Sequence, residues 1–138
     1  MLVVAVLLLH FLDFLTTYVV LVTGAGREAN VFMQHFNVDY NSVYYTFVAT
    51  TFALVALYAA ASRGAKSCNM LVRAASDAFL KSLYVLLVAK TLAVANNVHV
   101  LLFYKELMTY ESIVAVGALT AAAISAVQIR QFYASQKR

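Results

Sequence analysis

The 138-residue sequence has no proline, no tryptophan, four glycines and one cysteine, and only 12% of its residues are charged. The lack of proline and glycine suits long uninterrupted helices and argues against a membrane barrel with many turns. One cysteine, Cys68, excludes an internal disulfide framework and a cysteine-based metal cluster. Nucleotide-binding, nucleophile-elbow and H-E-x-x-H motifs are also missing. We therefore expect no catalytic residue, no metal and no cofactor.

Hydrophobic residues, in contrast, make up 64% of the chain. Soluble domains average about 45–50% apolar and about 25% charged residues, so lipid must solvate much of this protein. The net charge of +4 comes from basic residues scattered beside apolar segments rather than clustered. That pattern does not indicate nucleic-acid binding. The expected partner of most of the surface is the lipid bilayer.

Four apolar segments have about the 20 residues that a helix needs to cross about 30 Å of hydrocarbon. Helices are required because each segment must satisfy its own backbone polar groups in lipid. The first segment has no basic start and carries an acid at its middle, which favours a retained helix over a signal peptide. We predict an all-α, four-transmembrane-helix bundle forming a single integral membrane domain over 1–138, with helices at about 2–23, 43–62, 79–104 and 112–129.

Lysine and arginine are distributed unevenly around these segments. Seven flank one side, in the loop between the second and third segments and in the C-terminal tail: Arg63, Lys66, Arg73, Lys81, Arg130, Lys137 and Arg138. Two flank the other side: Arg27 and Lys105. Because positively charged loops stay cytoplasmic, we predict a multi-pass protein of the cell membrane with both termini inside.

The loop between the second and third segments is itself expected to be partly helical. Met70, Ala74 and Ala78 fall on one helical face, and Arg73, Asp77 and Lys81 follow at intervals of four residues and can pair. We therefore expect the third helix to begin well before the membrane.

Asp13 and Lys90 are charged residues inside apolar segments. An unpartnered charge at the bilayer centre is unfavourable by several kcal/mol. Asp13 is ten residues from the outer end of its segment and Lys90 is fourteen from the end of its own, so their depths differ by only about 6 Å. Three interpretations remain open. The two residues form a structural ion pair that fixes helix register, they form a proton or ion relay, or they contact another subunit or ligand.

Other polar residues are expected near Asp13 or toward the outer side of the bundle. The helical period places His10, Thr16 and Thr17 on the face of Asp13, although a threonine also readily bonds its own backbone four residues back. A second group lies toward the outer side: Glu28, Asn30, Asn96, Asn97 and His99. These residues either line an outward-facing polar pocket or make interhelical hydrogen bonds of about 0.6 kcal/mol each.

The fourth segment contains small residues at four-residue spacing, which lets helices approach closely. One row is Gly117, Ala121 and Ser125, and the next is Ala118, Ala122 and Ala126. This face suits either a dimer contact or a seam within the chain. We favour the internal seam, because the second segment offers matching alanines at Ala49, Ala53, Ala56 and Ala60.

The first helix and its exit resemble an uncharacterised family of small four-helix prokaryotic membrane proteins. The residues that carry the resemblance are Asp13, Thr16, Thr17, Gly24, Gly26, Glu28 and Asn30, with Lys90 in the third helix. Val31 stands where that family usually has proline. The resemblance implies the four-helix architecture and no particular activity.

These observations favour a non-catalytic accessory or scaffolding subunit that contacts other membrane subunits or itself. The alternative is a small oligomeric proton- or ion-coupled transporter or channel that uses Asp13. An accessory subunit should be isolated together with other chains in fixed stoichiometry. A transporter or channel should instead conduct protons or ions without other chains. An intramembrane enzyme ranks third, because no nucleophile–base pair is present.

Overall fold

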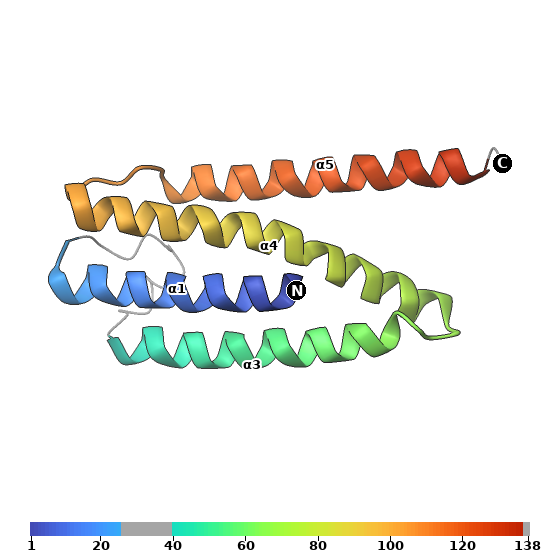
Figure 1. Ribbon diagram of the computed structural model, residues 1–138, viewed down its shortest axis with the longest axis horizontal. Coiled ribbons are helices and arrows are strands. Elements are labelled where there is room, and N and C mark those ends of the chain that lie inside the picture. Colours follow the sequence, from blue (N-terminus) through green and yellow to red (C-terminus); the bar gives the residue numbers. More distant parts are fainter. Residues whose placement is uncertain (26–39, 137–138) are drawn as a thin grey trace.

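The computed structural model describes residues 1–25 and 40–136, and within these ranges the chain folds into helices without a strand (Figure 1). The helices are α1 (Leu2–Thr23), α3 (Tyr40–Gly64), α4 (Met70–Phe103) and α5 (Tyr110–Gln136). Each contains a stretch that is long and apolar enough to cross a membrane. The prediction of four helices with the length and apolar composition to cross a membrane is confirmed.

The helix boundaries differ most from the predicted ones at the start of α4, which is nine residues earlier, and at the end of α5, which is seven residues later. Helix α4 begins at Met70, because the Asn69 side chain caps it by accepting hydrogen bonds from the backbone N–H groups of Leu71 and Val72. Asp77 and Lys81 form an ion pair one turn apart. The expected early start of the third helix is therefore confirmed, and α4 is 34 residues long.

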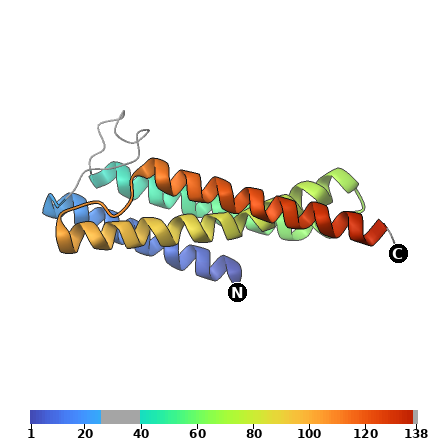
Figure 2. The same cartoon turned by 90° about the horizontal axis from the view of Figure 1, so that it is seen from above.

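The four helices form an open bundle. α4 contacts α1, α3 and α5, and α1 contacts α3, whereas α5 contacts α4 alone among the described helices. α5 and α3 consequently lie at opposite edges of the molecule (Figure 1), and in the view from above α5 passes in front of α3 (Figure 2). Few apolar side chains are buried inside the chain: Val6, Val20, Val43, Ala61, Leu83 and Val100. Most other apolar side chains face outward, as expected when lipid is the solvent.

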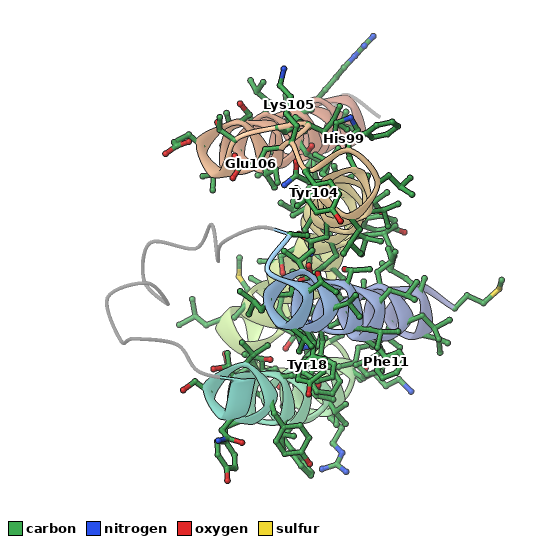
Figure 3. The ribbon with its side chains drawn as sticks, turned by 90° about the vertical axis from the view of Figure 1, so that its left-hand side faces the viewer. Phe11, Tyr18, His99, Tyr104, Lys105 and Glu106 are labelled. Carbon is green, nitrogen blue, oxygen red and sulfur yellow. The ribbon has the colours of Figure 1, made fainter. Side chains whose placement is uncertain are left out.

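α1 packs against α3 mainly through aromatic rings. Phe14 stacks on Phe47 with ring centroids 4.3 Å apart, and Phe11 approaches the same ring at 6.1 Å. Phe11 and Tyr18 project from α1 on the side of α3 (Figure 3). Such ring pairs add about 0.5–1.5 kcal/mol beyond the area they bury.

The internal seam that we favoured between the fourth and second segments is wrong. α5 packs on α4, where Gly117 is buried and a Cβ on it would lie 3.9 Å from Val85 Cγ1. No contact joins α5 to α3 among the described residues. The alanines of α3 and the second α5 row are exposed: Ala49, Ala53, Ala56, Ala60, Ala118, Ala122 and Ala126. The physical reason is that α1 and α4 bind each other through polar groups and α1 binds α3 through rings, which puts both helices between α3 and α5.

The closest approach of α3 to α4 lies at their shared turn. A Cβ added to Gly64 would collide with Ser76 Oγ and would lie 3.2 Å from Val72 Cγ1. Ser76 is itself buried, at 8% exposure. Any Cβ at this position would therefore crowd the side chains of Ser76 and Val72 and force the Ser76 hydroxyl to move.

We expect Gly64→Val to destabilise the protein by about 1–3 kcal/mol, because the added branches overpack this contact. Ala60→Val is the matched control, since Ala60 lies one turn earlier on the same helix and is exposed. The free energy of unfolding in detergent micelles measures both. Equal losses in the two variants would contradict the close approach.

Candidate functional site

The central polar contact joins α1 to α4. Lys90 Nζ donates a hydrogen bond to Asp13 Oδ2 at 2.5 Å, and the two side chains are 23% and 17% exposed respectively. Asp13 is eleven residues beyond Leu2, or about 16 Å along the helix, which is half the thickness of the hydrocarbon core. The structure thus brings two opposite charges together near the middle of the apolar helix α1.

Asn97 extends this contact toward the C-terminal end of α1. Its Nδ2 lies 2.9 Å from Thr17 Oγ1, 3.2 Å from Thr16 Oγ1 and 3.4 Å from Asp13 Oδ1. An amide nitrogen has two hydrogens, so three acceptors share them. Thr16 also donates to the Leu12 carbonyl oxygen at 2.9 Å, which is the local backbone bond anticipated for a helical threonine. Asp13 therefore receives donors from two residues of α4.

His10 connects α1 to α3 instead. Its Nε2 lies 2.9 Å from Thr50 Oγ1, and its ring lies 5.1 Å from the ring of Phe47. The single hydroxyl hydrogen of Thr50 is donated to the Thr46 carbonyl oxygen at 2.7 Å, so Nε2 of His10 is the donor. His10 thus lies beside the ion pair and holds the neighbouring helix.

The polar residues predicted toward the outer side do not form one pocket. Asn97 faces α1, whereas the Asn96 side chain accepts from the backbone N–H groups of Leu107 and Met108 at 2.9 and 2.8 Å. His99 Nδ1 donates to the Lys105 carbonyl oxygen at 2.7 Å, and these residues lie together at the α4–α5 turn (Figure 3). Glu28 and Asn30 lie outside the described residues.

Adjacent residues on a helix point about 100° apart, which separates Asn96 from Asn97. That spacing alone indicates two different partners. No sequence pattern marked Thr50 as a site residue. Its contact with His10 arises because α3 lies beside α1, and the sequence did not predict that neighbourhood.

The network is saturated. Every buried side-chain nitrogen or oxygen in the described ranges has a hydrogen-bond partner. Those ranges contain no group of three His, Cys, Asp or Glu residues able to hold a metal ion. The arrangement can fix the register of α1 on α4, and it places a carboxylate and an ammonium where a proton can pass between them.

Comparison with known proteins finds no match: no family model, no curated sequence and no solved structure is similar to this chain. The fold is all-helical over the described residues, and its four long apolar helices are compatible with a multi-pass membrane protein.

We expect Asp13→Asn and Lys90→Met each to destabilise the protein by about 2.5–3.5 kcal/mol, because each leaves one charge unpaired in the hydrocarbon. The double variant should lose clearly less than the sum, since it strands neither charge. Unfolding of all three variants in bicelles measures the coupling. Thr91→Val is the control, because Thr91 is exposed and bonds only the Leu87 carbonyl of its own helix. Strict additivity would show that the pair contributes no coupling energy.

Proposed function

We propose that this chain is a non-catalytic integral membrane protein that acts as an accessory or scaffolding subunit and binds other membrane helices. The proposal rests on the exposed edge of α5: among the described helices this helix contacts α4 alone, and its second small-residue row is exposed. The alanines of α3 are exposed at the opposite edge. The molecule therefore presents, at each of two edges, a row of exposed small side chains beside larger apolar ones, with no partner helix within the described residues.

Small side chains at these edges favour protein partners over lipid. Helix–helix association in membranes depends on close backbone packing, and its interfaces are enriched in alanine, glycine and serine. A row such as Ala118, Ala122 and Ala126 leaves room for a facing helix to approach. The partner that fits is a transmembrane helix, either of another subunit or of a second copy.

The polar network supports an association role as well. Asp13, Lys90 and Asn97 satisfy one another within the chain, so this buried polar contact leaves no charge that a partner helix has to match. The described segments between helices are short turns, at 65–69 and 104–109, and offer little surface outside a membrane. Within this proposal both termini face the cytoplasm, and the first helix is that of the small prokaryotic family it resembles.

We expect the protein extracted gently from native membranes to carry other chains, or further copies of itself, in fixed stoichiometry. Ala122→Leu with Ala126→Leu should weaken this association roughly 5- to 150-fold, since overpacking a tight contact costs about 1–3 kcal/mol. Ala115→Leu is the matched control, because exposed Ala115 shares its row with the large Leu119 and Val127. A protein that is extracted alone under all mild conditions would overturn the proposal.

A second candidate is a proton- or ion-coupled transporter that oligomerises around Asp13. The observation that favours it is the partial exposure of the pair, at 17% and 23%, which leaves the charges reachable from outside the chain. The Asn97 amide that reaches this carboxylate also bonds two threonine hydroxyls, and His10 precedes Asp13 by one turn of α1.

For this candidate, purified protein in liposomes should dissipate an imposed proton or sodium gradient, and Asp13→Asn should abolish the flux. Asp77→Asn makes the same chemical change at an exposed ion pair and should leave it intact. Absence of flux from the wild-type protein would eliminate the candidate.

A further inference from the structure

Three arginines occupy one level of the molecule, each on a different helix. Arg63 is in the last turn of α3, Arg73 is in the first turns of α4, and Arg130 is near the end of α5. All three side chains are exposed. These ends of α3, α4 and α5 lie on the side where α1 begins (Figure 1).

Two close contacts between helices show that the three arginines lie at similar heights along the bundle. Gly64 meets Val72 and Ser76, so its neighbour Arg63 lies beside the first turns of α4. Gly117 meets Val85, and these two helices run antiparallel. Thirteen residues after Gly117, toward the end of α5, is Arg130. Thirteen residues before Val85, toward the start of α4, is Val72, the neighbour of Arg73. Arg130 and Arg73 therefore lie at the same height along the bundle. The three arginines therefore lie at nearly the same height along the bundle axis, within about one helical turn or roughly 5 Å of rise, although each is on a different helix.

The depth of this level follows from α1. The 22 residues of α1 span about 33 Å, which matches the hydrocarbon core, so Leu2 marks one boundary of that core. The contacts Asp13–Lys90 and Thr17–Asn97 align Leu2 with residues 79–82 of α4. Arg73 is six to nine residues farther out, or roughly 9–14 Å. A headgroup layer is about 5–8 Å thick, so an arginine side chain reaching back contacts it.

The charges at this level are free to bind. The nearby carboxylate of Asp77 is taken by Lys81, and no ion pair involves Arg63, Arg73 or Arg130 within the described part of the chain. A guanidinium presents a planar fork of donors that matches a phosphate bidentately, which an ammonium does not.

We propose that Arg63, Arg73 and Arg130 form a binding surface for the phosphate groups of anionic phospholipids, in the leaflet where α1 begins. The surface does not depend on the association role proposed above. It also differs from the general excess of basic residues on one side of the membrane. That excess counts lysine and arginine alike, whether paired or free, whereas this surface requires three unpaired arginines at one depth.

The test is to equilibrate the intact protein in nanodiscs of equal parts phosphatidylglycerol and phosphatidylcholine, then to release it and count retained lipids by native mass spectrometry. The wild-type protein should retain phosphatidylglycerol preferentially. Each arginine-to-glutamine change should weaken that preference about fivefold, as expected for about 1 kcal/mol per basic residue at an anionic surface. Changing all three to lysine should lose part of the preference, since charge remains without the fork.

Two controls separate this surface from unspecific attraction. Lys66→Gln removes a charge from the turn beyond the arginine level, and Lys105→Gln removes one at the opposite end of the bundle. Both should retain the wild-type preference. Arg130→Gln, on the peripheral helix α5, should keep the fold and still weaken the preference for phosphatidylglycerol about fivefold. The proposal is overturned if the triple glutamine variant retains phosphatidylglycerol, if Lys105→Gln loses as much as Arg73→Gln, or if millimolar inorganic phosphate displaces the lipid completely.

Discussion

The ion pair between Asp13 and Lys90 is the contact on which the arrangement of this bundle depends. Hydrocarbon offers no solvation to a carboxylate or an ammonium, so either charge alone would disfavour insertion by several kcal/mol. Lys90 Nζ and Asp13 Oδ2 are instead 2.5 Å apart, and the carboxylate also accepts a hydrogen bond from the Asn97 amide. These contacts bind α1 to α4 at one depth. Sliding either helix by a turn would separate the charges, so the pair determines register as well as adjacency.

The remaining helices are held by weaker and less specific forces. Rings from Phe14 and Phe47 and the bond from His10 to Thr50 attach α3 to α1, and Asn96 ties the α4–α5 turn to α4. No such polar contact draws α5 toward α1 or α3 in the described ranges. Lipid tails are as apolar as the helix surfaces, so there is no hydrophobic drive to close the bundle. An open molecule with two small-residue edges is the consequence.

Several features of this fold followed from local properties of the sequence. Hydropathy and length predicted the four helices, and Leu2–Thr23 agrees at both ends. Charge pattern and helical period predicted that α4 begins before the membrane. Distances counted along two helices placed Asp13 and Lys90 at similar depth, because the rise of a helix per residue is fixed. The partners of Asn96 and His10 could not be predicted this way, since they lie on a turn and on another helix.

The sequence by itself therefore determined which segments are helical, where charges enter the membrane, and that these charges need partners. Tertiary structure alone decided which faces meet. The alanines of α3 and the small-residue row of α5 match in spacing and yet remain apart, because α1 and α4 lie between them. The spacing of small residues is a property of one helix. Which helices become neighbours depends on the balance of contact energies among all four helices. A saturated ion pair and stacked rings outweigh the packing of small side chains in that balance.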